Sequence, residues 1–338
     1  MAGAKTLKEV SKLPKTMHER LERALKLALE EVERRNARIV GIQLPDGLKH
    51  YVPEIVDEFE GRGIETLVSG KATYGACDVD TELIREVDVL LHFAHEPIGI
   101  EFDRVVFIPY TYDYDIQAVV SLAERIEEKM ISLVATSQYV HRLEDVKEEL
   151  EKLGYSVSLK RGSNRVPKAG LVLGCNFTAV NRGAEAIVFI GDGLFHPRGA
   201  AIYSGKKVYA ISPLERKLRI VKEKEVQEFL RRRYALVAKA MDCEVFCILA
   251  TSKPGQNRVK LALELKNDLR SKGKKCYIAY FDEIRSENFP CDCFVNTACP
   301  RIAYDDWKKF RKPVLTPQEM EIVIGKRNWE NYEMDEIL

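Results

Sequence analysis

The feature that most constrains the fold of this chain is a pattern that occurs three times. In each copy, an apolar segment with the length of a β-strand precedes a segment whose apolar residues recur at three- and four-residue steps, as on one face of a helix. A glycine then stands where the helix should end, and a second apolar strand follows. The first strands are expected at 38–45, 130–138 and 244–252, and the helices at 51–63, 141–154 and 258–273.

Further apolar strands complete each copy. The second strands are expected at 64–70, 155–160 and 274–281, and later strands at 87–94, 104–110, 186–193, 207–213, 293–298 and 313–317. Strands and helices in alternation predict an α/β protein of three pseudo-repeated small domains with parallel sheets and flanking helices, each of about 100 residues. We place these domains at 1–120 with an opening helix near 16–36, at 121–236, and at 237–338 with the C-terminal tail.

One cysteine in each copy lies in a turn of small residues near the C-terminal end of a strand. Cys77 lies in GACD, Cys175 follows the apolar segment LVLG, and Cys299 lies in NTACP. Ligands of open α/β sheets gather at the carboxyl ends of the strands. If the three domains pack in a triangle around a pseudo-threefold axis, the three thiols converge at its centre.

Three converging thiols in such turns suit an iron–sulfur cluster. The cluster is bulky and anionic, so the backbone must approach closely and direct N–H groups at the sulfurs, which Gly75, Gly174 and Ala298 permit. Three protein ligands for four irons leave one iron open to a substrate, as in catalytic zinc sites. Two alternatives remain: each cysteine alone is typical of a buried residue at a tight turn, and three cysteines could bind zinc, although structural zinc usually takes closely spaced pairs.

The overall charge and hydropathy exclude several classes of protein. Lys and Arg number 53 against 52 Asp and Glu, a net charge of +1, so the chain has no global attraction to nucleic acid or to anionic lipid. No apolar run approaches the roughly 18 residues that span a bilayer, and the first residues lack the apolar region of a signal peptide. We therefore expect a cytoplasmic protein that binds neither nucleic acid nor membrane.

The three cysteine turns, YGACDVD, LGCNFTAV and NTACPRI, together with QLPDGLK in the first copy, resemble the archaeal diphthamide-biosynthesis enzymes. These are 2-(3-amino-3-carboxypropyl)histidine synthases. The resemblance extends from about residue 38 to about residue 318, and the three turns occur in the same order. It implies that Cys77, Cys175 and Cys299 hold one 4Fe–4S cluster per chain at the centre of the three domains.

The resemblance also implies radical chemistry. Such an enzyme uses S-adenosylmethionine without the usual CxxxCxxC motif, which this sequence lacks. One electron from the cluster breaks the bond from the sulfonium to the methionine γ-carbon and gives a 3-amino-3-carboxypropyl radical and 5′-methylthioadenosine. The radical adds to the imidazole C2 of a histidine of translation elongation factor 2, the first step of diphthamide biosynthesis. The implied partners are elongation factor 2, an electron donor and a second copy of the chain in a homodimer.

The residues that hold S-adenosylmethionine are expected among polar groups in the loops after the strands. Arginine suits the substrate carboxylate because its planar fork binds both oxygens, and an acidic residue suits the amino group or the ribose hydroxyls. Asp46-Gly47 is equally typical of an ordinary turn. His196 is a candidate general base, because product formation removes a proton from the imidazole C2. The candidates for binding are Asp46, Gln256, Arg258 and Arg301, with His196 and Arg198 in the GDGLFHPRG loop.

Two other kinds of protein share some of these features. Quinolinate synthase is also a triangular three-domain enzyme with three cysteines, but its open iron acts as a Lewis acid without radicals. A non-enzymatic three-domain binding protein with buried cysteines would show the same hydrophobic pattern. The turn sequences favour the diphthamide family. Release of 5′-methylthioadenosine distinguishes it from quinolinate synthase, and a brown, iron-containing protein after purification without oxygen distinguishes it from a binding protein.

The remaining charged and cysteine-containing segments are interpreted as structural. Residues 217–234 are expected to form a charged helix, and Arg231, Arg232 and Arg233 are expected on its solvated face rather than against a partner protein. A disulfide framework is not expected in a cytosolic chain, so the other cysteines are read as small hydrophobic residues. In particular, Cys243 and Cys247 are expected in one strand with both thiols on the same face. These structural cysteines are Cys243, Cys247, Cys276, Cys291 and Cys293.

Overall fold

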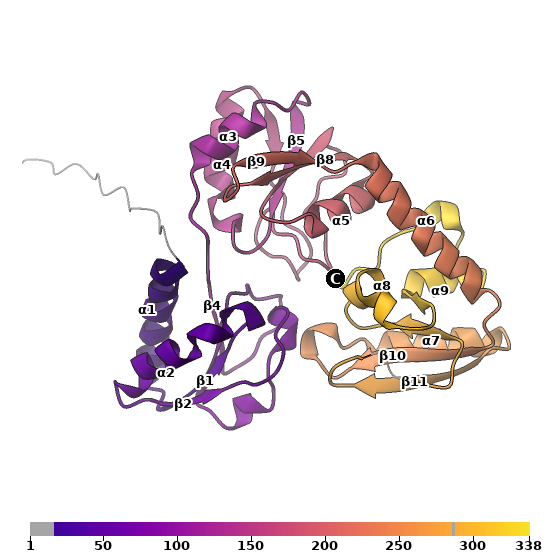
Figure 1. The fold of residues 1–338 in the computed structure, drawn as a ribbon, viewed down its shortest axis with the longest axis horizontal. Helices are drawn as coiled ribbons and strands as arrows, with labels where there is room; N and C mark the ends of the chain where they lie inside the picture. Colours follow the sequence, from indigo (N-terminus) through magenta and orange to yellow (C-terminus); the bar gives the residue numbers. More distant parts are fainter. Residues whose placement is uncertain (1–16, 286–287) are drawn as a thin grey trace, which may run out of the picture.

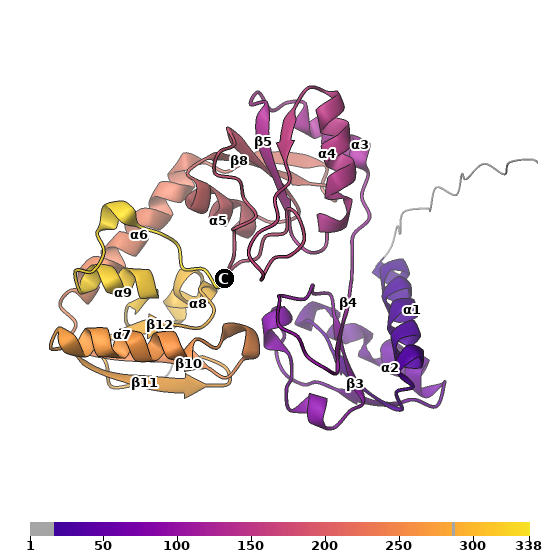
Figure 2. The same ribbon diagram turned by 180° about the vertical axis from the view of Figure 1, so that it is seen from behind.

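The structure consists of three α/β units, each built around its own β-sheet. It is a computed structural model that describes residues 17–285 and 288–338. The three units lie at the corners of a triangle, with the C-terminus of the chain near its centre (Figure 1). The view from behind shows the same arrangement (Figure 2). The prediction of three pseudo-repeated α/β units in a triangle is therefore confirmed.

The first unit has a four-stranded parallel sheet. Its helix α1 (Met17–Arg35), predicted for residues 16–36, buries residues at three- and four-residue steps, among them Leu21, Leu25, Ala28 and Val32. This face of α1 shares one hydrophobic core with the sheet and with helix α2 (Val52–Glu60). The strand order is β2-β1-β3-β4, with β1 Ile39–Gln43, β2 Glu65–Val68, β3 Val89–Phe93 and β4 Val105–Ile108.

The second unit has a five-stranded sheet with one antiparallel edge. Its helices are α3 (Ile116–Ala123), α4 (Leu143–Lys152) and α5 (Phe195–Ser204). The central strand β7 is apolar and buried along its whole length, as expected for a sheet covered on both faces. The strand order is β6-β5-β7-β8-β9, with β5 Met130–Ala135, β6 Ser156–Ser158, β7 Ala186–Ile190, β8 Lys207–Ser212 and β9 Lys217–Ile220.

Strand β9 corrects the prediction of a single helix over residues 217–234. The segment Lys217–Ile220 alternates polar and apolar residues and pairs antiparallel with β8, where Ser212 opposes Lys217. A period of two suits a strand rather than a helix. The helix α6 (Glu223–Ala240) begins only after this strand and leads to the third unit (Figure 1).

The third unit repeats the strand order of the first. Its helices after α6 are α7 (Val259–Ser271), α8 (Arg301–Tyr304) and α9 (Pro317–Val323). The cap of α9 is formed by Thr316, whose hydroxyl accepts from the backbone N–H of Glu319 while the Glu319 carboxylate accepts from the N–H of Thr316. The parallel sheet has the order β11-β10-β12-β13, with β10 Val245–Thr251, β11 Lys275–Phe281, β12 Cys293–Asn296 and β13 Val314–Leu315.

The shared strand order explains why the three units present similar loops to one another. In each sheet the second strand lies at one edge, followed by the first, the third and the fourth. Parallel strands direct their carboxyl ends to one edge of the sheet, and ligands of such sheets gather there. The domain limits 1–120, 121–236 and 237–338 stay a prediction; one sheet falls within each range, and the two internal limits fall inside α3 and α6.

Helix α6 holds a buried ion pair that corrects the reading of Arg233. The Arg233 and Glu319 side chains are both 0 % exposed, and Nε of Arg233 donates to the Glu319 carboxylate at 2.7 Å. The guanidinium also donates to the carbonyls of Ala303 (2.7 Å) and Val314 (2.8 Å). Arg233 therefore joins α6 to the core of the third unit and cannot contact a partner protein, whereas Arg231 and Arg232 are exposed as predicted.

Helix α6, with 18 residues, and α1, with 19, are the longest helices that the structure describes. Both carry charged residues along much of their length. Within residues 17–285 and 288–338, no helix combines the length and the apolar character that crossing a membrane would require.

The structural cysteines differ from the prediction in two respects. Cys243 and Cys293 form a disulfide with an S–S distance of 2.06 Å, because Cys243 lies just before β10 and Cys293 begins the neighbouring strand β12. Cys243 and Cys247 also belong to different hydrophobic clusters, because Cys243 precedes the strand and does not follow its alternation. Cys247 and Cys291 are buried free thiols, and Cys276 is a partly buried one, in agreement with their reading as hydrophobic residues.

Candidate functional site

The three units meet around a cavity of about 600 Å³ that is lined by Cys77, Cys175 and Cys299. One cysteine comes from each unit, so residues far apart in the sequence converge in space. Burial, and after it the neighbouring Cys175 and Cys77, raises the pKa of the Cys299 thiol. This mutual influence means that the three sulfurs share one environment. In the part of the chain that the structure describes, no three His, Cys, Asp or Glu side chains are grouped for a single metal ion.

Cys77 lies in a short 3-10 helix, Ala76–Asp78, and is held from the third unit. Nε2 of Gln256 donates to the Cys77 sulfur (3.2 Å) and to Oδ1 of Asp78 (3.2 Å). Nζ of Lys253 lies 2.9 Å from the same Asp78 oxygen. Burial, then the charge of Asp78 and the neighbouring Cys175, raises the pKa of the Cys77 thiol to about 12. The loop 253–256 therefore fixes both the cysteine and the carboxylate beside it.

Gly255 in this loop is packed directly against Cys77. A Cβ atom at position 255 would lie 2.4 Å from the Cβ and 2.5 Å from the Cα of Cys77. The carbonyl of Gly255 accepts a hydrogen bond of 2.7 Å from the Arg165 guanidinium of the second unit. All three units thus contribute to the position of Cys77, and only glycine fits at 255.

Cys175 lies in a turn closed by an isolated bridge between Leu173 and Asn176. The sequence predicts a strand just before this cysteine, but Leu171 makes only a single parallel bridge to Ala135. A Cβ atom at Gly174 would lie 2.8 Å from the ring of Phe195, so this turn also requires a small residue. Cys175 is thus presented by a loop that packs under the start of α5.

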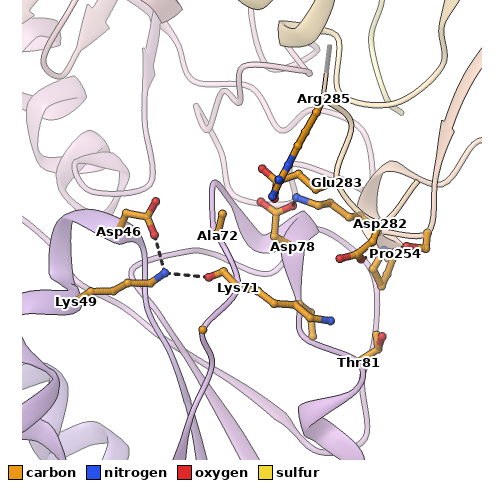
Figure 3. A pocket seen from close by; sticks show the side chains of 14 residues that line it. Asp46, Lys49, Lys71, Ala72, Asp78, Thr81, Pro254, Asp282, Glu283 and Arg285 are labelled. Atoms are coloured by element: carbon orange, nitrogen blue, oxygen red, sulfur yellow. Dashed lines mark hydrogen bonds and ion pairs between the residues drawn. The ribbon is translucent and has the colours of Figure 1, made fainter. Parts of the chain in front are cut away.

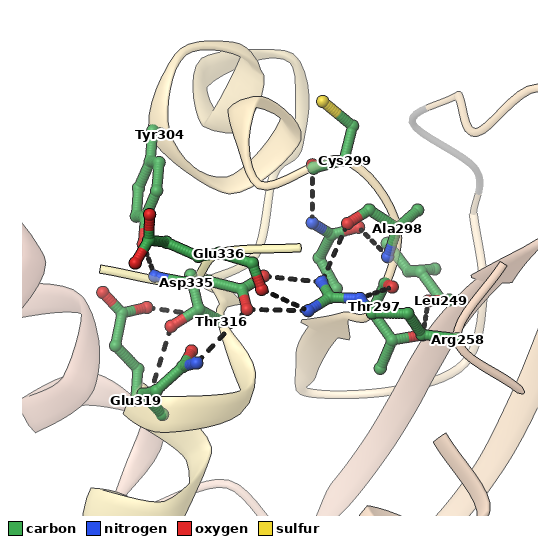
Figure 4. A network of polar contacts seen from close by, with 12 residues as sticks. Leu249, Arg258, Thr297, Ala298, Cys299, Tyr304, Thr316, Glu319, Asp335 and Glu336 are labelled. Carbon is green, nitrogen blue, oxygen red and sulfur yellow. Dashed lines mark hydrogen bonds and ion pairs between the residues drawn. The ribbon is translucent and has the colours of Figure 1, made fainter. Parts of the chain in front are cut away.

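Cys299 lies in a turn after β12 that is held by its own neighbours. Nδ2 of Asn296 donates to the Cys299 carbonyl (2.9 Å), and Oδ1 of Asn296 accepts from the backbone N–H of Ala298 (3.2 Å). The Arg258 guanidinium donates to the carbonyls of Thr297 (2.7 Å) and Ala298 (2.9 Å). Figure 4 shows this network, in which Arg258 supports the turn from below the cysteine.

The C-terminal tail connects two of the cysteine turns, a role that no sequence motif indicated. Asp335, 2 % exposed, accepts two hydrogen bonds from Arg258, at 2.8 and 2.6 Å (Figure 4). Two residues later, the backbone N–H of Ile337 donates to the Cys175 carbonyl (2.9 Å), and the Ile337 carbonyl accepts from Asn176 (2.8 Å). The tail therefore ties the Cys175 turn of the second unit to the Cys299 turn of the third.

We expect Asp335→Asn to lower the free energy of unfolding by about 1.5–3 kcal/mol, the usual worth of hydrogen bonds to a charged group. The amide keeps the shape but leaves the partly buried Arg258 guanidinium without its counter-charge. Chemical denaturation measures the effect. Glu333→Gln is the matched control, because Glu333 pairs with Arg327 at an exposed position, where we expect a change within about 0.5 kcal/mol. Equal effects of the two substitutions would contradict the role of Asp335.

The predicted substrate-binding residues fall in different places. Gln256, Arg301 and His196 line the cavity with the cysteines. Arg258 is committed to the Cys299 turn and to Asp335, and Arg198 forms an ion pair of 2.6 Å with Glu225. The binding roles of these residues stay predictions.

Asp46 lies in a neighbouring pocket of about 540 Å³ between the first and third units (Figure 3). There it forms an ion pair of 2.7 Å with Lys49. The lining of this pocket carries both signs of charge, and Lys253 and Asp78 border it. The loop 253–256 lines both this pocket and the cysteine cavity, so the two lie next to each other.

His196 and Arg301 lie side by side at one wall of the cavity. Arg301 stacks over the Phe195 ring, with its Cζ 3.9 Å from the ring centroid, and pairs with Asp305 at 2.7 Å. Burial, and then the charge of Arg301, lowers the pKa of His196 to about 4. His196 is therefore neutral at physiological pH.

Several cavity residues were not predicted from the sequence. Lys253 lies in the same loop as the predicted Gln256, directly after the strand expected at 244–252, so its place after β10 was a usable signal. His95 directly follows the strand expected at 87–94, so its place was also a usable signal, whereas Arg165 lies in no predicted strand or helix and in no cysteine turn. Arg165 is 6 % exposed, and its Nε finds no hydrogen-bond acceptor among the described residues. The cavity thus holds a buried cation with an unused donor.

Known proteins with this architecture identify the family. The family model described as "Putative diphthamide synthesis protein" matches residues 44–334. The 2-(3-amino-3-carboxypropyl)histidine synthase of Pyrococcus horikoshii is 36% identical over 321 residues, which is 92% of each chain. Subunit 1 of the synthase of Schizosaccharomyces pombe is 31% identical over 323 residues, 89% of this chain and 73% of that protein.

A solved structure supports the same assignment. The crystal structure of Dph2 from Pyrococcus horikoshii with a 4Fe-4S cluster superposes with a TM-score of 0.86 and 34% sequence identity. The match covers 93% of this chain and 94% of that chain. The resemblance that the cysteine turns indicated is thereby confirmed over nearly the whole fold. This chain belongs to the family of diphthamide synthesis proteins.

Proposed function

We propose that this protein catalyses the first step of diphthamide biosynthesis. In this reaction a 3-amino-3-carboxypropyl group is transferred from S-adenosylmethionine to the imidazole C2 of a histidine in translation elongation factor 2. The observation that carries the proposal is the convergence of Cys77, Cys175 and Cys299, one from each unit, on a single cavity. The relatives are named for this product, and one of them has been crystallised with a 4Fe-4S cluster.

The residues around the cavity fit such a cluster. Gly255 and Gly174 leave room for the backbone to approach where a larger side chain would collide. The unused Nε donor of Arg165 and the Lys253 ammonium suit an anionic group. Cys77, Cys175 and Cys299 would hold the cluster and leave its fourth iron open to the substrate. When bound, the cluster would supply the electron that cleaves the sulfonium at the methionine γ-carbon.

The protein itself decides which bond of the sulfonium is presented for cleavage. Arg165 and Arg301 are placed to bind the methionine carboxylate, because a guanidinium can hold both carboxylate oxygens. Gln256 holds the Cys77 sulfur and so positions this ligand relative to the substrate. The buried part of the cavity limits the contact of water with a reactive carbon radical. Specific orientation in this cavity is the source of the reaction's selectivity.

The partners that we propose are those that the resemblance to the family implies. The protein substrate is elongation factor 2, an electron donor reduces the cluster, and the active form is a cytoplasmic homodimer with one cluster per chain. The cavity of about 600 Å³ would hold the sulfonium substrate, and its open side must admit the histidine-bearing segment of the elongation factor.

The ligand assignment is tested by iron content. We expect Cys77→Ala, Cys175→Ala and Cys299→Ala each to lose nearly all of the about four irons per chain expected for a cubane cluster, because two thiolates do not retain it. Cys276→Ala is the matched control, since its thiol lies in the hydrophobic periphery of the third unit, and it should retain the iron. Iron is measured after purification without oxygen. Equal iron in all four variants would exclude the proposed ligands.

The reaction is tested by its products. Wild-type protein incubated with a reductant and S-adenosylmethionine should release 5′-methylthioadenosine, and with elongation factor 2 it should produce the modified histidine. Release of 5′-deoxyadenosine, or no cleavage by the iron-loaded protein, would disprove the proposed function.

A further inference from the structure

A chain of hydrogen bonds leads from the buried interior of the first unit to the cysteine cavity. It begins at Gln43, 0 % exposed, at the end of β1. Nδ1 of His92 lies 3.0 Å from Oε1 of Gln43, and Nε2 of His92 lies 2.9 Å from Nδ1 of His95. His95 lines the cavity together with Cys77, Cys175 and Cys299. The neighbouring carboxylate of Glu96 is paired with Lys168 at 2.7 Å.

Backbone groups determine the orientation of the Gln43 amide. Its Nε2 donates to the Asp78 carbonyl (2.7 Å), which can only accept, and to the Thr73 hydroxyl (3.1 Å). Its Oε1 accepts from the backbone N–H of Asp80 (3.1 Å), which can only donate. The oxygen of Gln43 therefore faces His92. Reversing the amide would lose the two bonds to the backbone, from Nε2 to the Asp78 carbonyl and from the Asp80 N–H to Oε1.

This orientation determines the tautomer of both histidines. Because Oε1 of Gln43 accepts, Nδ1 of His92 carries a proton and donates it. His92 is neutral, since burial and then His95 lower its pKa to about 3, so its Nε2 is an acceptor. Nδ1 of His95 must then donate to it. Burial also lowers the pKa of His95 to about 4, so this ring is neutral and its Nε2 carries a lone pair.

The lone pair of His95 has no partner in the described part of the protein. Its Nε2 takes part in no hydrogen bond there. His95 lines the cavity and its Nδ1 is bound to His92, so Nε2 is the ring nitrogen left available to a group in the cavity. The chain is not a proton wire, since the Gln43 amide oxygen cannot take up a proton from His92. A proton that arrives at Nε2 of His95 can be shared with Nε2 of His92 through their hydrogen bond, but it can go no further and leaves by the cavity.

We propose that His95 is the catalytic base that accepts the proton released from C2 of the substrate imidazole, and that His92 and Gln43 are positioning residues that hold its lone pair toward the cavity. The proposal rests on the proposed function. The overall transfer is redox-neutral: the carbon–sulfur bond of the sulfonium and the C2–H bond of the imidazole break, and a C2–C bond forms. The thioether leaves with the sulfur electron pair, and the remaining proton goes to Nε2 of His95.

His196, the base suggested by the sequence, is less suited to this role. It stacks parallel to Phe189 with ring centroids 6.0 Å apart, and no hydrogen bond in the described residues sets its tautomer. The nearby guanidinium of Arg301 disfavours a positive charge on its ring. His95 has an uncharged acceptor behind it, which stabilises the proton on Nδ1 as the ring becomes an imidazolium.

The tautomers can be measured without any activity. Nitrogen-15 NMR of the protein labelled at its histidines should show His92 and His95 both protonated at Nδ1 and unprotonated at Nε2. The resonances are assigned with variants that each lack one histidine. In His92→Phe, His95 loses the hydrogen bond that sets its tautomer and should populate both forms. A wild-type His95 protonated at Nε2 would overturn the proposal, whatever the fate of the proposed function.

The catalytic role is tested by the number of modified histidines formed per 5′-methylthioadenosine released. We expect this ratio to fall about tenfold or more in His95→Ala, and added imidazole to restore part of it, as for loss of a general base. His92→Phe should lower the ratio to a smaller extent. His141→Gln is the control, because His141 pairs with Asp113 outside the cavity.

These outcomes separate the two proposals. An unchanged ratio in His95→Ala would exclude His95 as the base while leaving the transfer reaction intact. Wild-type protein that releases no 5′-methylthioadenosine would exclude the transfer reaction, but the NMR result would still report the tautomers. Thermal unfolding and iron content are measured for each variant, and His95→Gln, which retains a polar side chain of similar length, replaces His95→Ala if the alanine variant does not fold.

Discussion

We expect Gly255→Ala to lose most of its bound iron although it changes no proposed ligand. The added Cβ would lie 2.4 Å from Cβ and 2.5 Å from Cα of Cys77, distances that require the backbone to move. The loop cannot simply withdraw, because the Gly255 carbonyl is held by Arg165 and Gln256 is bonded to the Cys77 sulfur. Displacement of Cys77 would remove one of the three proposed ligands, and the proposed site has no fourth cysteine to replace it.

Iron per chain after anaerobic purification measures this effect, together with the free energy of unfolding, which should fall by about 1–3 kcal/mol as for other overpacked sites. Gly47→Ala is the control, because a Cβ at position 47 meets no atom within 4 Å. Wild-type iron content in Gly255→Ala would show that the contact between the loop and Cys77 is not required for binding the cluster.

The second large effect is expected for stability, from Glu319→Gln in the third unit. This substitution leaves the guanidinium of Arg233 buried without its counter-charge, and Arg233 is 0 % exposed. Breaking a buried ion pair by removing one partner costs about 3–5 kcal/mol. The variant should therefore unfold at a much lower denaturant concentration, and the third unit should be the first to lose protection against hydrogen exchange.

Two further variants distinguish a buried charge from a general loss of packing. The double variant Arg233→Met, Glu319→Leu should recover part of the stability, because it removes both charges. Recovery should be incomplete, since the carbonyls of Ala303 and Val314 lose their donors. Glu215→Gln, which breaks an exposed ion pair with Arg219, should change stability by less than about 1 kcal/mol. If Glu319→Gln lowered the free energy of unfolding no more than Glu215→Gln does, the stabilising role of the Arg233–Glu319 ion pair would be contradicted.

The cysteine turns illustrate how much of the site could be predicted from the sequence. Their positions near strand ends indicated convergence, because parallel strands direct their carboxyl ends to one edge of each sheet. The structure brings Cys77, Cys175 and Cys299 to one cavity as this reasoning required. Local signals sufficed here because the turn residues and the strand pattern are both short-range features.

Other residues of the site depend on contacts between units and left no local signal. Arg165 and Asp335 lie in segments without strand or helix periodicity, yet one holds Gly255 and the other holds Arg258. Arg258 was predicted to bind the substrate because it is an arginine in a loop after a strand. In the structure it supports the Cys299 turn instead. A sequence reports which groups are charged, whereas the partners of Arg165 and Arg258 are set by packing between residues that are 90 and 77 positions apart in the chain.

The sequence by itself determined the three α/β units, their strands except β9, the helices α1, α2, α4 and α7, and the three cysteine turns, because hydrophobic periodicity and small-residue turns act within a few neighbouring residues. Only the tertiary structure decided the Cys243–Cys293 disulfide, the burial of Arg233, the passage of the tail beside Cys175, and the hydrogen-bond chain from Gln43 to His95. Each of these depends on which side chains face one another after the units pack, and this is set by the sum of many weak contacts rather than by any one segment.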